Sequence, residues 1–197
     1  WQESFQSLWL STVEAIQDAW GKVWVGALER GISRIDVKAG NHVTNFPPRT
    51  PLGHPTPFDD YPPNPRDFFS DRPDHLWVAA LDGIRSCTLP EFRCLRDTSS
   101  AALANNLGVH AIAADAQGRL WAGASNGVLR YDNGQWQRVP GWPLGAIQVR
   151  AFANTPDGAL WIATGGGGIV RHDRGRFTQV SVIDGLPSDV VRALHVD

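Results

Sequence analysis

Short apolar stretches alternate with polar turns along this chain, and one pair of stretches recurs four times. The second stretch of each pair centres on a tryptophan, in the segments 21–36, 74–87, 118–134 and 158–175. The first is an alternating segment ahead of it, such as VHAIAAD (109–115). Alternation of apolar and polar residues over four to eight positions predicts half-buried strands. We therefore expect an all-β fold.

The spacing of the repeats predicts a β-propeller. The repeat tryptophans Trp24, Trp77, Trp121 and Trp161 lie 53, 44 and 40 residues apart. A period near 40–45 residues with several short strands is typical of propeller blades, each a four-stranded sheet. We name the strands A to D, and we expect the tryptophans on strand B, packed between adjacent blades. The predicted blades are 9–46, 66–98, 107–140 and 147–180, followed by the first strand of a fifth at 185–197.

Turn signals support this division. Asn133-Gly134 predicts a type I′ hairpin between strands C and D, and Arg174-Gly175 takes the same place one repeat later. The segment STVEAIQDAW (11–20) could form a capped helix, but its counterparts in the other repeats are strand-like, so we expect a strand. Four blades and one strand do not close a ring, and methionine is absent even at position 1. We interpret the chain as an excerpt of a larger ring.

Four consecutive glycines, Gly165 to Gly168, suggest a phosphate-binding loop at first sight. Such a loop leads into a helix or ends in Gly-Lys-Ser/Thr, but here Arg174-Gly175 follows too soon for a helix and no lysine lies between 158 and 175. The other repeats carry glycine at the same point. We therefore predict a structural loop between strands B and C, where positive φ requires residues without Cβ.

Two cysteines, Cys87 and Cys94, flank a predicted turn at Pro90-Glu91. With those turn residues the cysteines are directly opposed on strands C and D of the second blade. Opposed Cβ atoms lie about 4.5–5.5 Å apart, so a slight approach would allow a disulfide. A disulfide would indicate an oxidising compartment. The alternative is two small, buried apolar side chains.

Charge and hydropathy exclude some classes of function. The net charge is −2 with a pI near 6.3, and no run of lysine or arginine is present, so we expect no nucleic-acid partner. No apolar run approaches the roughly 18 residues of a membrane span. Any membrane association would come from flanking segments missing from this sequence.

The motifs resemble a known family. GLPSDVVRALHVD (185–197), together with DAQGRLWAGASNGVLRYDNG (115–134), resembles the regulator-propeller repeat of bacterial two-component sensors. The third and fourth repeats match best. The first lacks one residue before Trp-Val-Gly, and the second has Asp74-His75 for Gly-x and Ala79 for the glycine after the tryptophan.

This resemblance implies an extracytoplasmic, periplasmic sensory region, commonly a pair of seven-bladed propellers. A β-sandwich domain, a membrane helix and a cytoplasmic histidine kinase or diguanylate cyclase would follow. The family's motif residues are structural, so no catalytic or binding residue carries over from them. We expect no cofactor, a small molecule, glycan or protein as partner, and a possible homodimer of the full-length receptor.

A proline-rich segment, 47–65, connects the first two blades. Strand parity places this connection at the end of the blades where the B–C loops lie. Its Phe58 and Tyr61 argue against full disorder. It would be either an ordered cover over that face, contributing to ligand binding, or a flexible surface loop.

The second position of each strand A suggests a ligand site at the same end. These residues run from acidic to basic: Glu14, Asp67, His110, Arg150 and Arg192. They could bind a polar ligand at the channel mouth, or form ion pairs between blades.

Catalytic interpretations are weaker. The six histidines show no metal-ligand spacing, so no metal site is predicted, and no Gly-x-Ser-x-Gly motif is present. The acids Asp18, Asp71 and Asp115 belong to the repeated A–B turn. We expect no catalytic residue here. The alternatives are a scaffold for protein partners, or a propeller lyase or hydrolase in which His110 near Glu14 would act.

Overall fold

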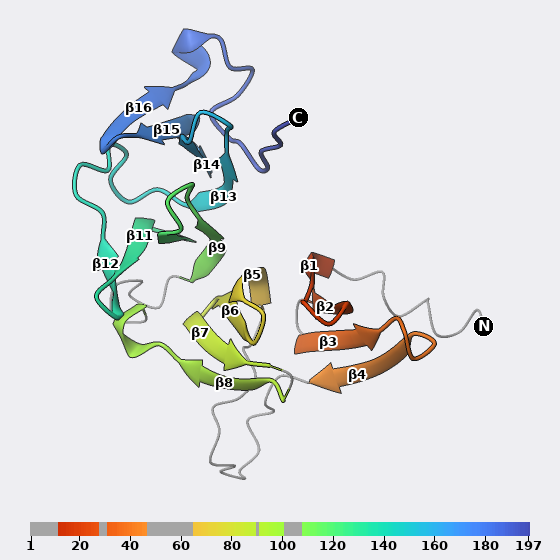
Figure 1. Cartoon of the computed structure of the whole chain (residues 1–197). Helices are drawn as coiled ribbons and strands as arrows, with labels where there is room; N and C mark the ends of the chain where they lie inside the picture. Colours follow the sequence, from red (N-terminus) through yellow and green to blue (C-terminus); the bar gives the residue numbers. More distant parts are fainter. Residues whose placement is uncertain (1–11, 28–30, 47–64, 90, 101–107) are drawn as a thin grey trace. The chain divides into compact units, whose positions relative to one another are not determined.

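Each half of the chain contains two four-stranded antiparallel sheets (Figure 1). The computed structural model describes residues 12–27, 31–46, 65–89, 91–100 and 108–197. It divides into two compact units, Trp1–Asp97 and Thr98–Asp197, each of which we describe by itself. In every sheet the strands follow in sequence order, as in a propeller blade. The predicted all-β fold of four-stranded blades is confirmed.

The strands of the first unit form blades one and two. Blade one consists of β1 (Thr12–Gln17), β2 (Lys22–Ala27), β3 (Gly31–Asp36) and β4 (His42–Phe46). Blade two consists of β5 (Pro65–Arg72), β6 (His75–Ala80), β7 (Gly83–Thr88) and β8 (Arg93–Arg96). The segment STVEAIQDAW thus contains a strand, β1, rather than a helix.

The second unit contains blades three and four. Blade three consists of β9 (Val109–Ala114), β10 (Leu120–Ala124), β11 (Gly127–Asp132) and β12 (Gln135–Arg138). Blade four consists of β13 (Val149–Asn154), β14 (Leu160–Thr164), β15 (Ile169–Asp173) and β16 (Arg176–Val180), followed by the 3₁₀ turn η2 (Val182–Asp184). Asn133 and Gly134 have φ of 52° and 81°, and Arg174 and Gly175 have 47° and 80°, as type I′ turns require. No helix in the described residues is long and apolar enough to span a membrane.

The fifth strand expected in 185–197 is not formed. Val190 makes a single antiparallel bridge to Gly165, and Val191 N–H donates to Thr164 O at 2.9 Å. In the four described blades strand A pairs with the strand B that follows it. The segment 185–197 instead lies against the B–C loop of blade four.

The glycine quartet forms that B–C loop. Gly165 N–H donates to Gln148 O and Gly168 N–H to Asp189 O, each at 2.8 Å, and Gly167 N–H donates to Thr164 Oγ1 at 2.9 Å. Gly168 has φ of 73°, and an added Cβ would collide with Val180 O. These three N–H groups are engaged within the protein, so they do not form a cradle for phosphate.

A hydrogen bond between each repeat tryptophan and its A–B turn organises three of the blades. Trp24 Nε1–H donates to Asp18 Oδ2 and Trp121 Nε1–H to Asp115 Oδ2, both at 2.8 Å, across six residues. The Oδ1 atom of each aspartate accepts two backbone N–H bonds within the turn. One carboxylate thus shapes the turn and fixes the indole ring. We call this arrangement the tryptophan clamp.

Blades two and four vary the clamp. In blade four Thr155 Oγ1 accepts the Trp161 Nε1–H bond at 3.1 Å and donates to Asp157. In blade two Asp71 Oδ1 lies 2.7 Å from His75 Nδ1, and His75 Nε2 lies 2.7 Å from Ser86 Oγ. All four turns therefore carry a hydrogen-bond acceptor six residues before the tryptophan. The group that binds to this acceptor is the tryptophan in three blades and His75 in blade two.

Trp24 and Trp121 pack against the neighbouring blade of their unit. Within the described residues, the ring contacts found for Trp77 and Trp161 are to His75 and Arg171 of their own blades. Trp24 and Trp121 are fully buried, Trp77 is 5% exposed and Trp161 is half-buried. The Trp24 ring lies 4.7 Å from Phe92 of blade two, and the Trp121 ring 4.9 Å from His172 of blade four. The residue two positions after the tryptophan is small and lets the next strand A approach: Gly26 contacts Phe68 and Gly123 contacts Val149.

Cys87 and Cys94 are opposed on β7 and β8 and form a disulfide. Both are buried, beside Leu89 and Phe92 in the core between blades one and two. The bridge closes the C–D hairpin.

We predict that Asp115→Asn destabilises the protein by about 1–3 kcal/mol at neutral pH, because the amide weakens the bonds from Trp121 and Arg119. Burial raises the pKa of Asp115, but those hydrogen bonds and the charge of Arg119 outweigh it and hold the pKa below its usual value. The stabilisation is therefore present above the unfolded pKa of about 3.9 and lost as pH falls through the lower folded pKa.

Urea unfolding at pH 7 and at pH 3–4 measures this effect. Asp132→Asn is the control, because Asp132 binds only the surface residue Arg130 among the described residues. Equal losses in the two variants at pH 7 would contradict a stabilising role for the clamp.

We also predict that Gly123→Ala destabilises the protein more than Gly26→Ala does. An added Cβ at 123 would collide with Val149 Cγ1 and lie 2.9 Å from its Cβ, which the backbone fixes. At 26 it would meet the Phe68 ring at 3.0 Å, and that ring can move. Overpacking of this kind costs about 1–3 kcal/mol. Thermal unfolding of both variants tests the order, and the reverse order would refute the close contact at Val149.

Candidate functional site

All four A strands contain a β-bulge near their first residues. The ladder to strand B skips one residue in each blade: Val13, Arg66, His110 and Arg150. We call these the strand-A bulge residues. A bulge leaves its extra residue outside the regular ladder and redirects the side chain, and bulges are common beside binding sites. The four residues lie at the end of the blades that carries the B–C loops.

This register corrects the sequence-based alignment of the candidate ligand residues. Glu14 opposes Gly26 and Asp67 opposes Ala79, so both are equivalent to Ala111 and Ala151 rather than to His110 and Arg150. Each bulge residue stands eleven positions before its tryptophan, whereas Glu14 and Asp67 stand ten before theirs. The supposed change from acid to base disappears. The bulge series is one valine followed by three basic side chains.

His110 is half-buried at its bulge and points to the B–C loop of its own blade. Its Nε2 shares a 2.7 Å hydrogen bond with Ser125 Oγ, and Ser125 N–H donates to Gly108 O. The hydroxyl thus fixes the imidazole beside the start of β9.

Arg150, the corresponding residue of blade four, packs over a glycine. Gly165 replaces Ser125 in this blade, and a Cβ there would lie 3.1 Å from Arg150 Nε. Nε is buried and has no hydrogen-bond partner. Within the described residues Arg150 makes no ion pair through its terminal nitrogens either. Its half-buried charge is therefore left without a protein counter-ion.

Arg66 repeats this situation in the first unit. Its Nε is also buried without a hydrogen-bond partner, and no ion pair to Arg66 is found in the described part of the chain. By contrast, Arg85, Arg119 and Arg171 bind Asp82, Asp115 and Asp157. Unpaired buried polar groups are rare in native proteins and call for an explanation such as an absent ion or water.

The remaining candidate residues do not extend this group. Asp67 is half-buried and accepts the Phe68 N–H bond at 2.8 Å. Arg192 is exposed and follows Val191 as Arg150 follows Val149. The side chain of Glu14, the residues Phe58 and Tyr61, and the segment 47–64 lie outside the described residues. Their proposed roles stay predictions.

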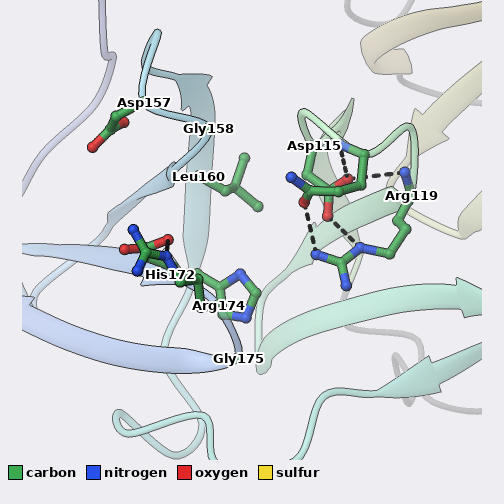
Figure 2. Close-up of a pocket in the computed structure, with 10 residues that line it drawn as sticks. Asp115, Arg119, Asp157, Gly158, Leu160, His172, Arg174 and Gly175 are labelled. Carbon is green, nitrogen blue, oxygen red and sulfur yellow. Dashed lines mark hydrogen bonds and ion pairs between the residues drawn. The ribbon is translucent and has the colours of Figure 1, made fainter.

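A polar pocket of about 320 Å³ lies at the opposite end of blades three and four, among the A–B and C–D turns. Figure 2 shows Asp115 and Arg119 on one side of it, facing His172 across the opening. Asp157, Asp173 and Arg174 complete its polar lining. The sequence did not indicate this pocket, because it arises where turns from two blades meet.

The charged groups of this pocket largely neutralise one another. Arg119 Nε donates to Asp115 Oδ2 at 2.7 Å, and Arg171 pairs with Asp157 and Asp173 at 2.9 and 3.1 Å. Hydrogen bonds from Thr155, Arg171 and Ala159 lower the pKa of Asp157 to about 2. The pocket therefore offers paired ions rather than an open charge.

His172 is the one histidine at this pocket. Its ring is 6% exposed and lies between Trp121 and Phe177, at 4.9 and 4.7 Å. Burial and the positive charge of Arg119 lower the pKa of His172, so the ring is neutral at physiological pH. It serves mainly as a packing residue between the two blades.

Asp71, His75 and Ser86 have the hydrogen-bond order of a serine-hydrolase triad. His75 is only 3% exposed and contacts the Trp77 ring edge-on at 4.9 Å. A buried imidazole that joins a turn to two strands favours a structural role. In the described residues no group of three or more His, Cys, Asp or Glu side chains could hold a metal ion.

Comparison with known proteins supports the fold and the repeat. The family model described as "Two component regulator propeller" matches residues 102–126. No curated protein sequence matches the chain significantly. Among solved structures, the extracellular domain of a putative hybrid two-component system from Bacteroides thetaiotaomicron is similar, with a TM-score of 0.72 and 18% identity over 95% of this chain and 24% of that one.

Two further structures show the same fold in other settings. PorZ, a surface component of the type-IX secretion system of Porphyromonas gingivalis, has a TM-score of 0.67 and 17% identity over 91% of this chain and 28% of its own. Virginiamycin B lyase from Staphylococcus aureus has a TM-score of 0.60 and 21% identity over 84% and 53%. The chain thus spans about a quarter of the first two. It carries the two-component regulator propeller repeat and has a β-propeller fold, shared with the extracellular domains of hybrid two-component systems.

Proposed function

We propose that this chain is part of the extracytoplasmic, ligand-binding propeller of a bacterial signal-transduction receptor, and that it is not catalytic itself. The repeat and the fold support a sensor. The observation that carries ligand binding is the strand-A bulge, which holds Arg66, His110 and Arg150 at equivalent positions and leaves both arginines without an ion pair among the described residues. The ligand would contact the end of the blades that carries the B–C loops.

Two alternatives are less well supported. A lyase or hydrolase is favoured only by the similarity to virginiamycin B lyase. Here His75, which is bonded to Ser86, and His172 are both buried. No third, orienting carboxylate is found for the His110–Ser125 pair in the described part of the chain, so these histidines favour structural roles. A protein scaffold is compatible with the fold of PorZ, but it gives no reason for unpaired arginines at repeated positions.

The disulfide supports a periplasmic location, because structural disulfides persist in oxidising compartments. We predict that Cys87 and Cys94, unfolded in denaturant directly after acid quenching of intact cells, are alkylated only when a reductant is added. Free thiols before reduction would contradict this location.

We further predict that Cys87→Ser/Cys94→Ser lowers the free energy of unfolding by about 2 kcal/mol, because the short loop between the cysteines gains freedom when unfolded. Thr88→Ala, on the exposed side of the same hairpin, is the control for urea unfolding. Equal midpoints for the two variants would show that the bridge does not stabilise the fold.

A reporter assay in the full-length receptor tests the function. We expect the double substitution His110→Ala/Arg150→Ala to abolish the response to the stimulus at unchanged protein level. It removes both polar side chains from the bulge positions of the second unit. The control is Arg174→Ala at the opposite pocket, whose side chain is 91% exposed, and it should respond normally. Normal signalling by the double variant, or loss of signalling only in the control, would refute ligand binding at the B–C end.

A further inference from the structure

The bulge arginines are held in a way that suits one class of ligand. Arg150 Nε is buried over Gly165, where the absent Cβ makes room for the guanidinium. This packing fixes one edge of the planar group. The two terminal nitrogens remain as donors, and no hydrogen bond from them to a described residue is found. Arg66 has the same buried Nε and the same lack of a partner.

An unpaired, half-buried guanidinium costs solvation free energy that a counter-ion would offset. Arginine always carries its charge, and its paired donors match the geometry of carboxylate, sulfate and phosphate groups. The same unpaired arginine occurs at the same bulge position in both units. A chance feature of local packing does not explain this repetition.

The neighbouring bulge of the second unit adds a further donor. In the second unit β9 and β13 pack against each other, so His110 occupies the bulge of the strand next to Arg150. The correction of the register removes Glu14 and Asp67 from this series. Ser125 supplies a hydroxyl bonded to His110.

We propose that the bulge positions bind the oxyanion groups of an acidic ligand, with Arg150 and His110 forming one subsite and Arg66 another. This rests on the proposed sensory function and names the class of its ligand. The shared chemistry is a carboxylate, sulfate or phosphate group, carried by an acidic sugar or present as a free anion.

Calorimetric titration of the purified protein at constant ionic strength tests the proposal. The probes are sodium glucuronate, inorganic sulfate and inorganic phosphate, with glucose as the neutral match of glucuronate. We expect glucuronate to bind and glucose not to bind. Saturation by sulfate or phosphate instead would assign the subsite to a free anion.

Arg150→Gln should weaken binding of the best anion at least tenfold, and Arg150→Lys, which keeps the charge but loses the fork, less so. Arg176→Gln is the matched control, because Arg176 is exposed on β16 of the same blade. Arg66→Gln tests the subsite of the first unit should Arg150→Gln unfold. Circular dichroism establishes that each variant is folded.

Equal binding of glucose and glucuronate, or equal losses in Arg150→Gln and Arg176→Gln, would overturn the anion subsite. A failure of the proposed function looks different. If the receptor's response depends on His110 and Arg150 but the protein binds none of the three anions, the anion subsite is wrong and the proposed sensory function is retained. If anions bind but the response does not depend on these residues, the sensory role of the subsite fails.

Discussion

The hydrogen bond from the tryptophan of strand B to its A–B turn is the interaction on which three of the four described blades depend. It fixes an indole ring with respect to a turn six residues earlier, and in blades one and three the same carboxylate holds the turn's backbone. The fixed ring then packs on an aromatic side chain of the next blade. In blade four Thr155 replaces the aspartate as acceptor, whereas in blade two the aspartate at this position, Asp71, bonds to His75 of strand B.

Close packing of neighbouring blades places the candidate site. Small residues two positions after the tryptophan let the following strand A approach, and the bulge of that strand lies between the residues that make the contact, at Arg66 between Pro65 and Phe68 and at Arg150 between Val149 and Phe152. The bulge turns a side chain out of the ladder without disturbing the buried ring. The structural repeat therefore also repeats the candidate ligand position, which individual blades fill with valine, arginine or histidine.

The fold could be predicted from the sequence because the tryptophan, the Asp-x-x-Gly turn and Asn133-Gly134 each have one favourable local structure. The candidate site could be predicted only in part. The sequence identifies His110 and Arg150 but not Arg66, because the predicted start of strand A in the second repeat lies one residue too late; counting eleven residues back from Trp77 finds Arg66. The pocket at Arg119 and His172 could not be predicted, since it depends on how turns of two blades meet.

Hydrogen–deuterium exchange of the protein with and without a bound ligand tests the location of the site most directly. Our account predicts that ligand slows exchange at residues 108–110, 148–150 and 165–168, where the bulges meet the B–C loops. Residues 115–119 and 171–175, around the opposite pocket, should exchange at the same rate in both states. Protection confined to that pocket would contradict a ligand site at the strand-A bulges.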